Sequence, residues 1–220
     1  MRMSNQLQGI VGQQEAPAAP PSTPASVFAW DVSTLRSTIE FTFPTPTPAG
    51  LTVVIFGGTS STAMTPPSDF TLIDELVAYC SVHAWVGDDL TNGTEGGTTI
   101  SVTPASVNPN VFYMVLIDGT YSTHSGIPGR EDPVPSMTAP GPGLGLWFST
   151  VKDAASPLFD VFPPVGSGIT KIDSEIGQLN MQRTGWGTKT VPAGPTGTQQ
   201  WTKDGDGSQR SMGLLFLDPV

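Results

Sequence analysis

The chain has 220 residues, of which 25 are glycine and 22 are proline, while 37% are hydrophobic and 13% are charged. The 5 tryptophans and 10 phenylalanines supply enough apolar surface for a core, which argues against a disordered chain. The formal net charge of −10 repels phosphate backbones and anionic lipids, so we expect neither nucleic acid nor a membrane as a partner.

The first segment, residues 1–25, is rich in Gln, Ala and Pro. Its run Ala16–Pro24 favours extended polyproline geometry and offers little apolar surface for a core. We therefore predict an extended attachment arm over residues 1–25 and a β-domain over residues 26–220. The first residues lack an apolar stretch of signal-peptide length, and about 18 consecutive apolar residues occur nowhere, so we expect no secretion signal and no membrane span.

From residue 26 onward, short runs of β-branched and aromatic residues lie between turn-forming residues, which indicates strands. Ile39–Phe43 alternates apolar and polar residues, as a half-buried strand does, while Leu51–Phe56 and Val111–Ile117 are apolar enough to be central strands. No segment has the pattern of an amphipathic helix. Further strands are predicted at Phe70–Asp74, Leu76–Val86, Thr98–Thr103, Leu144–Val151, Leu158–Phe162, Ile169–Ile172, Gln178–Arg183, Thr188–Val191, Gln199–Lys203 and Met212–Leu217.

Residues 120–143 hold five prolines and four glycines, a composition that predicts a long irregular loop and a second contact surface. The succession of strands predicts an all-β fold, an antiparallel β-sandwich of the jelly-roll-like kind. The two halves of the chain show a similar order of strands and turns, with an Ile-Asp strand in each half: Leu72–Asp74 and Lys171–Asp173. Internal duplication explains this pattern, and so does the alternation of strands in two sheets of one sandwich.

A search for catalytic clusters yields little. His83 and His124 are the only histidines, and two histidines without a third clustered ligand do not make a zinc site, so each is expected to be a surface or packing residue. Cys80, the only cysteine, lies in an apolar run and is expected to be a small buried side chain. We predict that the chain is not an enzyme and uses no cofactor.

The run Asp204–Ser208 resembles the start of a calcium-binding loop because oxygen ligands alternate on a glycine-rich turn. The pattern then breaks, since Gln209 stands where that loop needs glycine and Leu215 where it needs glutamate. A plain hairpin turn is the prediction here, and no metal ligands are assigned.

Tryptophans in loops with acidic neighbours are typical of sugar-binding sandwiches, where the ring stacks on a pyranose. Trp186 stands between two glycines and is the tryptophan predicted to be exposed, so Trp186, Asp204 and Asp206 form the candidate glycan contact. The other four are expected to lie in strands and in the core: Trp30, Trp85, Trp147 and Trp201.

Two segments, Phe41–Val54 and Pro66–Asp74, each combine a proline-rich turn with a strand. With the closing strands Val111–Gly119 and Gly213–Leu217, they are similar to the β-sandwich domains of tailed-bacteriophage virion proteins, especially minor tail proteins of phages that infect actinobacteria. The similarity spans about residues 27–220, and the chain departs from it by its small size and its long proline-rich loop. No catalytic residue belongs to these motifs.

The resemblance implies a virion structural protein, made in the cytoplasm of the bacterial host, whose partners are other virion proteins and copies of itself. We expect a minor tail component at the tail tip that assembles through its N-terminal arm. A capsid decoration or head-fibre protein is one alternative. A carbohydrate-binding module that contacts host cell-surface glycan is another.

Overall fold

The structure is a computed structural model, and it describes ten stretches of the chain. Nothing is described of the arm predicted over residues 1–25 or of the predicted turn at residues 204–208, which lie outside these stretches. Every regular element within the described part is a β-strand. The described residues are 26–34, 38–59, 63–77, 80–102, 110–119, 121–126, 133–152, 160–177, 182–203 and 209–219.

Two five-stranded antiparallel sheets form the body of the protein, and each is built from one half of the chain. The first sheet has the order β1–β7–β3–β5–β4 and the second the order β12–β13–β10–β16–β8. The strands of the first sheet are β1 (Val27–Ser33), β3 (Leu51–Thr59), β4 (Phe70–Leu76), β5 (Ser81–Gly87) and β7 (Asn110–Asp118). Those of the second are β8 (Tyr121–Gly126), β10 (Gly143–Lys152), β12 (Thr170–Ile176), β13 (Gln182–Val191) and β16 (Gln209–Pro219).

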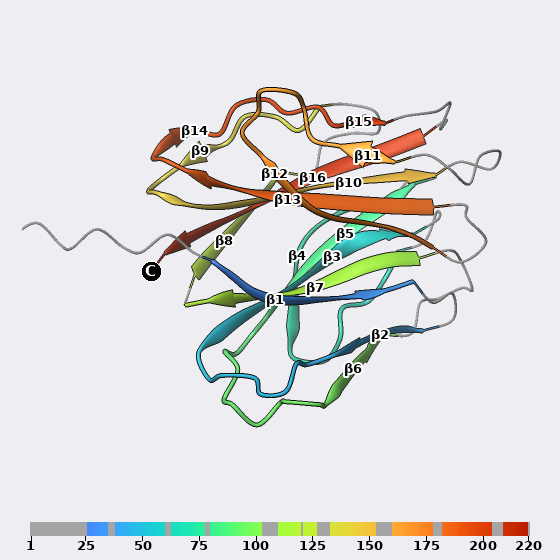
Figure 1. The fold of residues 1–220 in the computed structure, drawn as a ribbon, viewed down its shortest axis with the longest axis vertical. Helices are drawn as coiled ribbons and strands as arrows, with labels where there is room; N and C mark the ends of the chain where they lie inside the picture. Colours follow the sequence, from blue (N-terminus) through green and yellow to red (C-terminus); the bar gives the residue numbers. More distant parts are fainter. Residues whose placement is uncertain are drawn as a thin grey trace, which may run out of the picture.

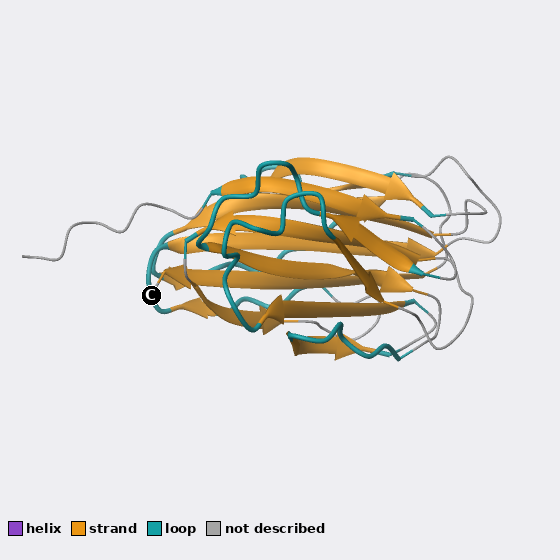
Figure 2. Ribbon diagram, turned by 90° about the horizontal axis from the view of Figure 1, so that it is seen from below, coloured by secondary structure: helices purple, strands orange, loops and turns teal. Residues whose placement is uncertain are grey.

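The two sheets lie face to face as stacked layers (Figure 1), and the view from below shows their strands lying side by side (Figure 2). Strand β3 packs against β10, β7 against β13, β5 against β16, and β4 against β8. The apolar side chains between the sheets form the central core, in which the rings of Phe56 and Phe148 lie 5.0 Å apart. The predicted antiparallel β-sandwich is therefore confirmed.

The outer faces of both sheets are also covered. A short sheet of β2 (Ile39–Thr42) and β6 (Thr99–Val102) lies over the first sheet and closes a second apolar cluster. Pairs of two-residue strands accompany a third cluster on the outer face of the second sheet. These short strands are β9 (Thr138–Ala139), β11 (Val161–Phe162), β14 (Gly194–Pro195) and β15 (Thr202–Lys203). Because both faces of each sheet are buried, the central strands read as continuous apolar runs.

The two sheets have the same topology. In chain order, β1, β3, β4, β5 and β7 of the first half occupy the places that β8, β10, β12, β13 and β16 occupy in the second. Even the irregularities agree, since the β4–β5 pairing shifts at Ile73 and the β12–β13 pairing shifts at Ile172. These two bulges lie in the Ile-Asp strands whose likeness the sequence shows, and the repeated architecture favours internal duplication over coincidental alternation.

Equating the two bulges fixes the correspondence of the remaining core strands through their pairing registers. Phe56 of β3 then corresponds to Phe148 of β10, and these rings meet in the central core. By the same registers, Gly87 at the end of β5 corresponds to Lys189 of β13. The sandwich thus has an approximate internal twofold relation, with β3 and β10 next to its axis.

The predicted ranges differ from the observed strands mainly in three places. Strand β13 runs without a break from Gln182 to Val191, where the sequence predicted two strands separated at the glycines. Gly185 and Gly187 do not interrupt the strand. A β-carbon on Gly185 would overlap the Val161 side chain, and one on Gly187 would overlap the Thr170 carbonyl, so glycine permits these close approaches.

The other two errors concern turns. The range Leu76–Val86 was predicted as one strand, but β4 ends at Leu76 and β5 begins at Ser81. Residues 120–143 were predicted as an irregular loop, yet Tyr121–Gly126 form edge strand β8, paired with β16. The prolines and glycines in the rest of this range hide the short strand signal of Tyr121–Gly126, and the neighbouring strand β16 decides the pairing.

Tyr113 supplies a test of the core. Its hydroxyl donates to the carbonyl of Thr184 at 3.1 Å, and burial first, then the charges of Asp173 and Glu175, raise its pKa far above the ordinary value of 10.0. The folded protein holds this proton where the unfolded chain releases it. Stability is therefore unaffected below about pH 10 and falls above it, by up to about 1.4 kcal/mol per pH unit. In Tyr113→Phe we expect a shallower decline of the unfolding free energy between about pH 10 and 11, measured by urea titration; equal slopes would contradict the buried proton.

Candidate functional site

Strand β1 is an edge of the first sheet, and β7 is its sheet partner. Two large apolar side chains of this strand are exposed, Phe28 at 46% and Trp30 at 41%. Phe28 lies at a bulge in the β1–β7 pairing. Among the strands that the structure describes, none forms a ladder with the free side of β1, although β2 lies beside its Asp31–Ser33 end. The part of the edge that carries Phe28 and Trp30 is left to pair with another chain.

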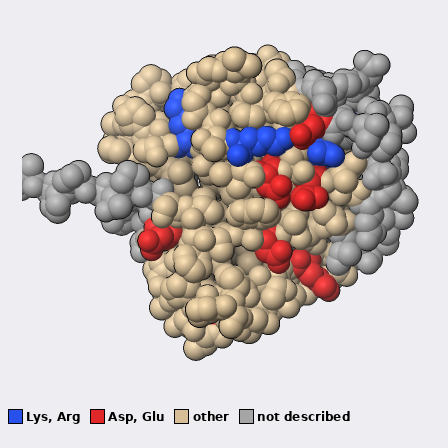
Figure 3. All heavy atoms as spheres, in the orientation of Figure 1, with Lys and Arg blue, Asp and Glu red and all other residues tan. Residues whose placement is uncertain are grey.

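Edge strands β4 and β12 differ from β1 in charge. Strand β4 carries Asp74 and Glu75, and β12 carries Lys171, Asp173 and Glu175. Charged side chains on an edge discourage pairing with other chains. Figure 3 shows Lys and Arg side chains running across the β12–β13 half of the face, with acidic side chains beneath them.

Strand β1 has a single charged residue, Asp31, and its carboxylate is already occupied. It accepts hydrogen bonds from the backbone N–H groups of Val32 at 2.8 Å and of Thr42, on β2, at 2.7 Å. By composition, β1 is therefore the least protected of these three edges.

The tryptophans are not placed as predicted. Trp186 is fully buried, because it points inward from β13, next to the central strand β10, and its ring packs on Tyr113 at 5.9 Å and Phe56 at 5.5 Å. The prediction that Trp186 is exposed is wrong, and its ring offers no platform for a sugar. Asp204 and Asp206 lie outside the described residues, so the structure does not bring the predicted glycan contact together.

Trp30 shows the opposite error, since it was expected in the core. It does lie in a strand, but on the edge, where its ring meets Tyr113 and Trp186 edge-on at 6.2 and 6.3 Å while part of it remains exposed. Trp85, Trp147 and Trp201 are fully buried, as predicted.

The predicted packing roles of Cys80 and His83 are confirmed. Cys80 is fully buried, and His83 is buried with its ring stacked near Trp85 and Phe112, at 5.9 and 6.2 Å. His124 belongs to β8, whose side chains are not described. Over the described ranges, no three His, Cys, Asp or Glu side chains gather as metal ligands, and no helix is long and apolar enough to cross a membrane.

A polar network lies on the outer face of the second sheet. Asp160 receives Lys171 at 2.8 Å, Arg183 at 3.3 Å and the Ser174 hydroxyl at 2.6 Å. Burial alone raises the pKa of the Asp160 carboxyl, but the hydrogen bonds from Lys171 and Ser174 and the Lys171 charge outweigh it and hold this pKa below its ordinary value. These groups satisfy one another, which makes the network a brace between β12, β13 and the chain before β11.

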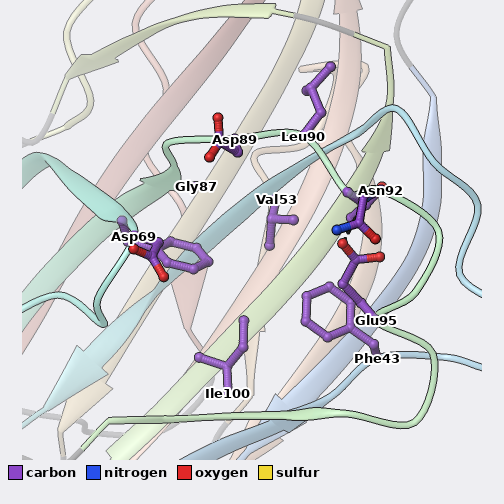
Figure 4. Close-up of a pocket in the computed structure, with 11 residues that line it drawn as sticks. Phe43, Val53, Asp69, Gly87, Asp89, Leu90, Asn92, Glu95 and Ile100 are labelled. Atoms are coloured by element: carbon purple, nitrogen blue, oxygen red, sulfur yellow. Dashed lines mark hydrogen bonds between the residues drawn. The ribbon is translucent and has the colours of Figure 1, made fainter.

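A hollow of about 260 Å³ opens on the outer face of the first sheet (Figure 4). Val53 lies at the centre of its floor, with Asp69 on one side and Glu95 and Asn92 on the other. Gly87 of β5 also lines it and contributes no side chain to fill it. No local pattern in the sequence marks this site, because the residues that line it come from several separate stretches of the chain.

Two loops position the acidic rim of this hollow. In the first, Asp69 has a φ of 66° and is, among the described residues, the one non-glycine in the left-handed region. Its carbonyl accepts the backbone N–H of Asp88 at 2.9 Å, which ties the turn before β4 to the end of β5. This anchoring keeps Asp69 in a conformation that L-residues seldom adopt.

The second loop follows β5. Thr91 donates its hydroxyl to the Pro48 carbonyl at 2.7 Å, and the Glu95 carboxylate accepts the backbone N–H groups of Asn92 at 2.7 Å and Gly93 at 3.0 Å. Burial raises the pKa of Glu95, but these backbone hydrogen bonds outweigh it and lower this pKa from its ordinary 4.5. The Glu95 side chain of this rim is therefore ionised at neutral pH.

No protein-family model, curated protein or solved structure matches the chain.

Proposed function

We propose that the chain is a structural protein of a bacteriophage particle, a minor tail component that joins its neighbours through β1 and the residues that precede it. The observation that carries the proposal is the free edge of β1, with Phe28 and Trp30 exposed. A strand or an extended segment from a neighbouring chain adds to such an edge by main-chain hydrogen bonds, and exposed aromatic rings supply apolar contact.

The rest of the molecule supports an assembly role. Three apolar clusters bury both faces of both sheets, so the sandwich is a rigid block whose contacts must form at its edges and loops. Residues 1–25 lead directly into β1, so an arm bound to a neighbour would hold the edge against it. The resemblance of Phe41–Val54 and Pro66–Asp74 to virion sandwiches favours a phage particle as the setting.

Light scattering coupled to size-exclusion chromatography tests the assembly surface. We expect the full chain to form an oligomer, and we expect Trp30→Lys to reduce it to monomer, because a charge on the edge opposes strand addition. Val165→Lys is the matched control, since Val165 is fully exposed in the turn before β12. Equal oligomers in Trp30→Lys and Val165→Lys would exclude β1 as the assembly edge.

Incorporation into particles tests the phage role. A chain that starts at Ser26 should fold and yet be absent from purified virions, while the full chain is present. A truncated chain that is still incorporated into virions would show that the arm is not required for assembly. Immunogold labelling of the full chain distinguishes the tail tip from the alternative positions on the capsid, and a full chain found in no particle overturns the proposal.

A further inference from the structure

The hollow at Gly87 has a counterpart in the second half of the chain, and that counterpart is occupied. The pairing registers equate Gly87 with Lys189 and the turn at Asp69 with the turn at Gly168. Asp69 and Gly168 share the left-handed conformation, with φ values of 66° and 73°. The two places are therefore built on the same backbone plan.

In the second half, Lys189 fills this place. Its Cε, Nζ and Cδ lie 3.4, 3.6 and 3.8 Å from the point where a β-carbon on Gly168 would stand, so its aliphatic end passes over this glycine. The ammonium donates to the carbonyl of Ser167 at 2.7 Å. The fold thus accommodates one lysine side chain between the end of the second-sheet strand and the turn.

In the first half, the same place is open and acidic. Gly87 leaves the space free, and Asp69 puts a carboxylate where Gly168 has no side chain. Phe70 and Val53 supply apolar surface for an alkyl chain, and Asp89 and Glu95 add negative charge to the rim. An aliphatic chain with a cationic end matches this combination of apolar floor and acidic rim.

We propose that the hollow at Gly87 binds a lysine side chain of a partner protein, with its methylenes over Val53 and Phe70 and its ammonium at Asp69. The chain's net charge of −10 favours a basic partner. A single side chain in so shallow a hollow binds with a Kd in the millimolar range, so the pocket acts as one contact within a larger interface. This proposal is independent of the assembly edge at β1.

The test is an NMR titration of the full chain with Nα-acetyl-lysine amide, with the norleucine analogue as the matched apolar probe. We expect saturable shifts at the backbone amides near Asp69 and Gly87 with the lysine compound, roughly threefold or more weaker binding of the norleucine compound, and a loss of affinity at high salt. Equal binding of both probes, or no saturable shift up to about 50 mM of the lysine compound, overturns the proposal.

Three variants locate the site. Gly87→Lys places in the first half the residue that the second half carries, and we expect it to abolish the shifts. Val165→Lys is the control, because it adds the same side chain at a fully exposed position outside the hollow, and it should bind within about twofold of the unmodified chain. Asp69→Asn keeps a residue that tolerates the left-handed turn and removes the charge, so we expect weakened lysine binding and unchanged norleucine binding. Undiminished lysine binding by Gly87→Lys would show that the hollow is not the site.

Discussion

Replacement of Trp186 by alanine is expected to lower the free energy of unfolding by about 3–5 kcal/mol, the range for removal of a fully buried tryptophan. The ring is fully buried and packs against Phe56 and Tyr113 between the sheets. Its removal leaves a cavity that the surrounding side chains fill only in part. Urea unfolding followed by circular dichroism measures the loss. If the alanine variant does not fold, Trp186→Phe gives a smaller loss of the same sign.

Trp30→Ala is the control, because Trp30 touches the same core from an edge strand and is 41% exposed. Its loss should be smaller, about 1–2 kcal/mol. Equal losses in the two variants, or a loss below about 1 kcal/mol for Trp186→Ala, would contradict the placement of Trp186. Reduced sugar binding by Trp186→Ala would therefore report a damaged core and would not identify a lost stacking contact.

Gly213→Ala is expected to cost about 1–3 kcal/mol although it adds only one methyl group. A β-carbon on Gly213 overlaps the edge of the Phe148 ring. That ring is fully buried and packs on Phe56 with centroids 5.0 Å apart, so it has little room to move away. The urea midpoint should fall while the m-value stays the same.

Two further variants test the cause of this loss. Gly87→Ala, also a strand glycine, should change stability by less than about 0.5 kcal/mol because its β-carbon meets only ordinary contacts. Phe148→Leu in the Gly213→Ala background should cost less than Phe148→Leu alone, since the smaller side chain relieves the overlap. Strictly additive losses would mean that Phe148 is not the obstacle.

The repeated sheets differ at two pairs of corresponding core positions. The pairing registers equate Tyr113 with Gly213 and Ala84 with Trp186, so each half carries one large and one small residue at this pair of positions. Tyr113 faces Trp186 across the core with ring centroids 5.9 Å apart. The small residues Ala84 and Gly213 are the corresponding pair on the other side of the approximate twofold. The core is therefore not strictly symmetric: the large residue of one half corresponds to the small residue of the other, and the total side-chain volume keeps the packing dense.

The sequence by itself determined the fold class, because strand formation leaves a local record. Leu51–Phe56 and Val111–Ile117 are apolar on both faces, and Ile39–Phe43 alternates, and these ranges lie in or overlap β3, β7 and β2. Turn residues mark where strands end, which located most elements within a few residues. The parallel between the two Ile-Asp strands was also visible, although it did not by itself separate duplication from alternation.

Only the tertiary structure decided which tryptophan is partly exposed, with which strand β8 pairs and where the surface has a hollow. Trp30 and Trp186 both lie in strands, but Trp30 is on an edge and Trp186 is on a strand flanked on both sides. Gly185 and Gly87 are both strand glycines, but Val161 covers the first and no side chain fills the hollow beside the second. Exposure and cavities depend on residues that are distant in the sequence, and local composition does not indicate which of these residues pack against a given position.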